Sequence, residues 1–235
     1  MENSFLSKRL FCILSGVSGI VGVVLLVVSF GIAIPPPENA TRAELLEFGR
    51  QHYVGVLCGA WLQAVGPVFI MLLAFSIVHL AGATQRLAGW MTFFGASILM
   101  TVSLVEITYY ISALFPDPEV MTSISLRVIS AVQHLYFTVA APAVFLPLGI
   151  ILTSSRVLPK AFGYLAFILA TTFAALGAVF MLRLVLPVWV TALAAVQGLW
   201  WLAAATTLVI RSASLSAAES STGCPAPYTN PRKFG

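Results

Sequence analysis

Two ionisable side chains, Glu106 and His134, lie far inside long apolar stretches of this sequence. Burying such groups in apolar surroundings is costly, so each requires a structural or functional reason. A carboxyl group and an imidazole that meet can exchange a proton, which is the basis of general acid–base chemistry. Two further apolar stretches contain the amide side chains of Gln63 and Gln197. Polar chemistry is therefore expected inside an otherwise apolar protein.

These polar side chains are predicted to lie at a common depth. With a rise of about 1.5 Å per residue, Gln63, Glu106, His134 and Gln197 each lie about 13–17 Å from the same end of their helices. Tyr110 follows Glu106 by one helical turn and shares its face. We predict a ligand-binding site made of these five residues, and we assign no residue a catalytic role.

Glu106 and His134 are predicted to face each other, because the break between their two stretches is short and the helices should be antiparallel neighbours. One polar stripe runs along the second of these stretches at spacings of three or four residues: Ser123, Arg127, Ser130, His134 and Thr138. Pro67 and Pro142 should bend their helices and free the carbonyls of Gln63 and Thr138. The bends favour a pocket, while a purely structural hydrogen-bonded layer remains the alternative.

Composition indicates which elements hold these residues. The chain is 60% hydrophobic and 9% charged, with a mean hydropathy of +1.00, whereas soluble domains carry roughly 25% charged residues. Six apolar stretches are long enough to cross a bilayer. Their predicted limits are residues 10–34, 54–81, 88–115, 124–153, 159–181 and 187–210. We predict an all-α, polytopic membrane bundle over residues 1–211, with residues 212–235 as a disordered tail. One long final helix across the fifth and sixth stretches is the alternative.

Two local patterns refine this architecture. Ser15, Ser18, Gly19 and Gly22 place small residues on one face of the first stretch, which favours close helix packing. Thr41 and Glu44 have the spacing of a capping box. They predict a short helix that either lies at the membrane interface or leads directly into the second stretch.

The lysines and arginines predict the orientation of the bundle. With the N-terminus inside, the cytoplasmic segments hold eight of them and the outer segments four, so both ends should lie in the cytoplasm. We expect a multi-pass protein of the bacterial plasma membrane. The net charge of +4 is explained by this asymmetry rather than by nucleic-acid binding.

No cofactor or metal is expected from the residues. The three cysteines have neither CxxC nor Cys/His metal-ligand spacing, and His134 has no second histidine at its depth to bind haem. No apolar stretch contains the central lysine that retinal requires.

The basic start at Lys8, Arg9 and Leu10, the long polar first loop and the stretch from Gly55 to Ala81 resemble a known group. These are the small bacterial membrane proteins of domain-of-unknown-function family 4386. The resemblance covers residues 8–211 and implies no activity.

The function that these features predict is binding or transport of a small, largely apolar molecule through a polar-layered pocket in the outer half of the bundle. One alternative is a membrane enzyme that uses Glu106 and His134 as an acid–base pair. Another is a non-catalytic subunit in which the polar layer only holds helices together. Expected partners are membrane lipid and a small apolar or amphipathic ligand, with a homo-oligomer or a membrane complex left open and no nucleic acid.

Overall fold

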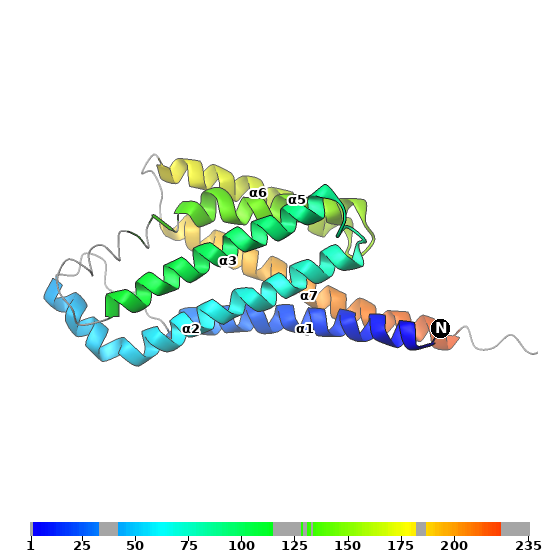
Figure 1. Cartoon of the computed structure of the whole chain (residues 1–235), viewed down its shortest axis with the longest axis horizontal. Coiled ribbons are helices and arrows are strands. Elements are labelled where there is room, and N and C mark those ends of the chain that lie inside the picture. Colours follow the sequence, from blue (N-terminus) through cyan, green and yellow to red (C-terminus); the bar gives the residue numbers. More distant parts are fainter. Residues whose placement is uncertain are drawn as a thin grey trace, which may run out of the picture.

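The computed structural model describes residues 2–32, 42–114, 128, 131–132, 134–181 and 187–221, and all regular elements within them are helical. Their bounds are α1 Glu2–Ile32, α2 Arg42–Leu80, α3 Leu87–Leu114, the π-helix η1 Tyr136–Ala140, α5 Ala141–Ser154, α6 Lys160–Met181 and α7 Pro187–Ser221. The helices run roughly along the long axis of an elongated bundle (Figure 1).

Within this described part of the chain, six helical segments are long and apolar enough to span a membrane. The fourth combines η1 with α5, from Tyr136 to Ser154. The six-helix prediction is therefore confirmed, and α6 and α7 are separate helices rather than one. Large apolar side chains such as Phe94, Ile168 and Leu199 are exposed on the outside. A lipid environment would cover such a surface, whereas water would not.

The helices form a ring in which each packs against the next: α1 on α2, α2 on α3, α3 on α5, α5 on α6, α6 on α7, and α7 back on α1. The N-terminus, the two short turns after α2 and α5, and the last turns of α7 lie at one end of the bundle (Figure 1). We call this the turn end. At Gly82 the first turn adopts a positive φ of 62°, which favours glycine.

The small-residue face of the first stretch forms the interface of α1 with its neighbours. A Cβ added at Gly22 would lie 2.8 Å from the carbonyl oxygen of Gly66 in α2, so the two backbones touch. Ser18 and Ser29 donate hydrogen bonds to the carbonyl oxygens of Phe69 and Gly59, both at 2.9 Å. The prediction that this face serves helix packing is confirmed. Small residues permit the close approach on which association in lipid depends.

A cluster of aromatic rings, most of them in edge-to-face contact, fills the bundle between α5, α6 and α7. We call it the aromatic core: Phe145, Phe162, Phe173, Trp200 and Trp201. Phe145 and Phe173 are completely buried, and Trp201 is 1% exposed. The indole Nε1 of Trp200 donates to the carbonyl oxygen of Phe162 at 3.1 Å. This bond satisfies the polar atom of a buried ring and ties α7 to α6.

One helix end confirms a predicted alternative, and another differs from the prediction. The capping-box segment leads directly into the second stretch, because α2 runs without interruption from Arg42 to Leu80. Helix α7 continues to Ser221, past the predicted start of the disordered tail at residue 212. Residues 212–221 contain three Ala, one Leu and one Glu, which favour a helix, together with five Ser, which favour it less. Residues 222–235 lie outside the described part of the chain.

Candidate functional site

A hydrogen bond between two helices defines the centre of the candidate site. The hydroxyl of Tyr136 in η1 donates to Oε1 of Gln197 in α7, at 2.7 Å. The two residues are 61 positions apart in sequence, so only the tertiary structure brings them together. In lipid, where no water competes, such a bond between helices is strongly favoured over two unsatisfied groups.

Helix α3 packs against η1, and Glu106 of α3 is within electrostatic range of Tyr136. Three elements, α3, η1 and α7, therefore each contribute a polar residue to the neighbourhood of Tyr136. We call Glu106, Tyr136 and Gln197 the polar cluster. All three residues are half-buried as a whole, while the Tyr136 hydroxyl that makes the hydrogen bond lies deep in the protein.

The register of α3 explains where Glu106 lies. Counting back along the helix, Val102, Leu99 and Gly95 precede it at steps of four, three and four, which keeps all of them on one face. Val102 and Leu99 are buried. Gly95 meets the backbone of Ala143, so this is the face that packs on α5. The same packing that joins α3 to α5 thus directs Glu106 toward η1.

The π-helix η1 positions Tyr136. Its bonding is shown at Ala141, whose backbone N–H donates to the carbonyl oxygen of Tyr136, five residues earlier. Pro142 follows immediately and lacks the N–H that the carbonyl of Thr138 would accept in an α-helix. The sequence predicts a bend and a freed Thr138 carbonyl here, and the structure has a π-helix at this position; the bend stays a prediction. Short π-helices insert one extra residue into a helix and occur often at functional sites.

Helix α6 also packs against η1. A Cβ added at Gly177 would lie 2.7 Å from Cα of Thr138, so the two backbones are in contact. The hydroxyl of Thr138 is buried at this crossing and has no hydrogen-bond partner among the described residues. Buried hydroxyls are usually paired, so this one is an exception next to the polar cluster.

The remaining predicted site residues differ in how the structure places them. His134 lies one residue before Leu135, the residue that precedes η1; it is half-buried and engaged with a neighbouring group, as is Glu106. Their pairing with each other stays a prediction. The backbone of Tyr110 belongs to α3, while its side chain lies outside the described part of the structure.

Gln63 lies away from the polar cluster. It follows Gly59 by four residues and precedes Gly66 by three, and both glycines contact α1. Gln63 therefore lies on the α1-facing side of α2, and among the described residues no hydrogen bond joins it to Glu106, Tyr136 or Gln197. Its predicted place in a common polar layer stays a prediction.

Sequence reasoning missed Tyr136. The available signal was a tyrosine six residues before Pro142 in the middle of an apolar stretch, because a buried phenol requires a hydrogen-bond partner. The partner could not be inferred, since it lies on the last helix.

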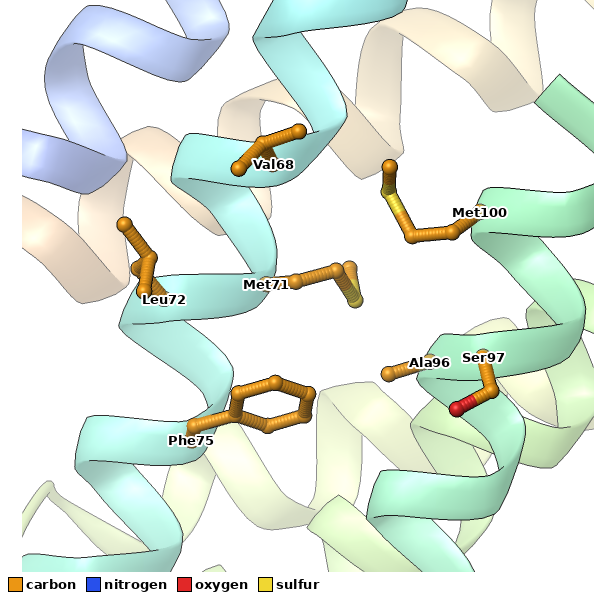
Figure 2. Close-up of a pocket in the computed structure, with 7 residues that line it drawn as sticks. All are labelled: Val68, Met71, Leu72, Phe75, Ala96, Ser97 and Met100. Carbon is orange, nitrogen blue, oxygen red and sulfur yellow. The ribbon is translucent and has the colours of Figure 1, made fainter. Parts of the chain in front are cut away.

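A second feature is an open groove of about 390 Å³ between α2 and α3 (Figure 2). Its walls are Val68, Met71, Leu72, Phe75, Ala96, Ser97 and Met100. The one hydroxyl there, on Ser97, donates to the carbonyl oxygen of Phe93 at 3.0 Å. Glu106 is six residues after Met100, which turns it roughly 120° away around α3. The groove is therefore apolar and separate from the polar cluster.

Among the described residues, no three His, Cys, Asp or Glu side chains gather as a possible metal-ligand set. Comparisons with known proteins find no match among family models, curated proteins or solved structures.

Proposed function

We propose that this protein is a multi-pass membrane protein that binds, and by binding moves, a small, largely apolar molecule whose polar group is held by the polar cluster. The observation that carries the proposal is the hydrogen bond from Tyr136 to Gln197, with Glu106 within electrostatic range, inside membrane-spanning helices. Polar groups from three helices converge where exposure to lipid would be unfavourable.

The chemistry of the cluster indicates what the ligand presents. Because Oε1 of Gln197 accepts from Tyr136, the amide nitrogen still carries two N–H donors, and no described residue accepts from it. Glu106 supplies a carboxyl group within electrostatic range of Tyr136. We infer a ligand with a hydrogen-bond acceptor, such as a carbonyl or hydroxyl oxygen, on an apolar body. Sites of this kind have mostly apolar walls and a few convergent polar groups.

The membrane orientation belongs to the same proposal. Of the described basic residues, Lys8, Arg9, Arg86, Arg156, Lys160 and Arg211 belong to the turn end, whereas Arg42 and Arg50 lie in the first turns of α2, toward the opposite end. We propose that this end faces the cytoplasm of a bacterial cell and that the polar cluster lies in the outer half of the membrane. The resemblance to family 4386 agrees with this setting and stays a prediction.

The test is to identify what the purified protein retains from a membrane lipid extract. Wild-type protein, Glu106→Gln and Gln197→Leu would be incubated with the extract in nanodiscs, and retained small molecules would be identified by mass spectrometry. We expect a molecule that the wild type retains and that both variants lose at least tenfold. Ser97→Ala, in the separate groove, serves as the control and should retain it.

Two results would contradict the proposal. If both folded variants retain the same molecules as the wild type, the polar cluster only joins helices, as in an accessory subunit. If the extract is converted to new products by the wild type and not by Glu106→Gln, the protein is an enzyme.

A further inference from the structure

Arg211 links two distant parts of the chain at the turn end. Its Nη1 donates to the carbonyl oxygens of Arg156 and Val157, at 3.0 and 2.6 Å. These carbonyls belong to the turn between α5 and α6, so hydrogen bonds join the C-terminal part of α7 to that turn. The bond also brings the Arg211 cation next to Arg156.

Two more cations occupy the same corner. Arg156 and Lys160 are exposed, and neither side chain has a partner among the described residues. The sequence contains no acidic residue between Glu119 and Glu219, so α5, α6 and the turn between them supply no carboxylate. Arg156 and Lys160 therefore add two exposed positive charges next to Arg211, and neither α5 nor α6 contains an acidic residue that could pair with them.

Ser155 directly precedes Arg156 in the turn between α5 and α6. Its hydroxyl is buried and makes no hydrogen bond to any described residue. A buried hydroxyl without a protein partner commonly indicates that a bound molecule supplies one. Ser155 thus adds a polar group to the corner formed by Arg156, Lys160 and Arg211.

The position of this corner identifies its environment. One membrane-spanning segment ends at Ser154, the next begins at Lys160, and the last ends at Ser212. The corner therefore lies where apolar helix surface gives way to the polar headgroup region. Directly along α6 from Lys160, Tyr164 and Ile168 are each 59% exposed at steps of four residues. A positively charged group is thus followed by an exposed apolar surface toward the centre of the membrane.

We propose that this corner, made of Ser155, Arg156, Lys160 and Arg211, binds the phosphate of one anionic phospholipid, whose acyl chain lies along Tyr164 and Ile168. Clustered lysine and arginine side chains at a membrane surface attract anionic headgroups. Arginine matches phosphate geometrically and forms strong charge-assisted hydrogen bonds with it. Arg211 acts as a positioning residue, because its bonds to the turn hold Arg156 in place.

The experiment measures thermal stability and lipid binding of the full chain purified in a neutral detergent. Phosphatidylglycerol, phosphatidylcholine or inorganic phosphate would be added at matched concentrations, with bound lipid counted by native mass spectrometry. For wild type we expect one retained phosphatidylglycerol and a Tm rise of about 2–4 °C. Phosphatidylcholine should be neither retained nor stabilising, because it has no net charge. Inorganic phosphate should not raise the Tm, because it has no acyl chain.

The variant Arg156→Gln/Lys160→Gln should lose the retained lipid and the Tm rise. Its Tm without lipid should match the wild type, because both side chains are exposed. Arg50→Gln, an exposed arginine near the opposite end of the bundle, is the control and should behave as wild type.

Three outcomes would overturn the proposal. Equal stabilisation by inorganic phosphate would show a free-anion site, and equal retention of phosphatidylcholine would show that charge does not matter. If Arg86→Gln, at the neighbouring turn, abolishes binding as fully as the double variant, the attraction is spread over the turn end and no single site exists.

Discussion

The aromatic core and the polar cluster touch each other, yet they are built in opposite ways. Phe173 belongs to the core and also meets Tyr136 of the cluster, with ring centroids 5.9 Å apart. In the core, side chains such as Phe145 are completely buried and most ring partners are neighbours in sequence or on adjacent helices. In the cluster, Tyr136 and Gln197 are only half-buried and are joined by a directional bond.

The difference shows which forces hold each region. Lipid is as apolar as a phenylalanine ring, so burial of the core gains little from the hydrophobic effect and depends on close packing. The cluster depends on hydrogen bonds whose alternative in lipid is an unsatisfied group. Tight packing excludes a ligand, whereas a half-buried polar cluster beside a π-helix can accept one. The site is therefore expected at the cluster and stability at the core.

The largest change in the free energy of unfolding should come from removing a large side chain from the aromatic core. Trp201 is 1% exposed and contacts Phe145 and Trp200, so Trp201→Ala should leave a cavity and reduce the free energy of unfolding by about 3–5 kcal/mol. Unfolding in mild detergent measures the change. Trp61→Ala is the control: Trp61 is 62% exposed, and the loss should stay below about 0.5 kcal/mol. Equal losses would mean that the core is not tightly packed.

The next effect concerns the close backbone contacts that support the core. In Gly22→Ala the new methyl group would lie 2.8 Å from the carbonyl oxygen of Gly66, so α1 and α2 must separate. We expect a loss of about 1–3 kcal/mol. Gly198→Ala has no atom within 4 Å of the added methyl group and should stabilise its helix by about 0.5–1 kcal/mol. Thermal unfolding would compare the two variants, and a shift of the same sign in both would contradict this packing.

A smaller effect is expected in the polar cluster. Tyr136→Phe removes the hydroxyl that donates to Gln197 and leaves the ring against Phe173. A double-mutant cycle with Gln197→Leu should give a coupling energy of about 0.6 kcal/mol, which is typical of hydrogen bonds between helices in membranes. A coupling energy of zero would show that the two residues act independently. In both single variants the amount of retained ligand should fall at least tenfold, while the free energy of unfolding should change only slightly.

The smallest change in stability should follow from removing the cause of the π-helix. Pro142→Ala restores a backbone N–H that the carbonyl of Thr138 can accept, so η1 should return to an α-helix and turn Tyr136 by roughly 100°. The coupling energy between Tyr136 and Gln197 should then disappear. Pro147→Ala, farther along α5, is the control and should leave the coupling unchanged. Persistence of the coupling in Pro142→Ala would mean that the π-helix does not position Tyr136.

Local sequence patterns determined the architecture and part of the site. The six apolar stretches can be identified from the sequence alone, because a helix that spans a lipid bilayer needs a minimum length and an apolar composition. The small-residue face with Ser18 and Gly22 likewise follows from helical spacing alone. Glu106 and Gln197 stood out as polar residues in apolar stretches, and both belong to the polar cluster.

What only the tertiary structure decided is which of these polar residues meet. The helical spacing of residues in the sequence shows which of them share a face of one helix. It does not show how that helix is rotated relative to the others. Gln63 therefore shares the predicted depth of the other polar residues, yet it lies on the α1-facing side of α2. Tyr136 belongs to the cluster for two reasons. The π-helix changes the register of the helix before Pro142. In addition, α7 places Gln197, 61 residues later in the sequence, next to the Tyr136 hydroxyl. Such meetings depend on packing between distant segments, which no local pattern encodes.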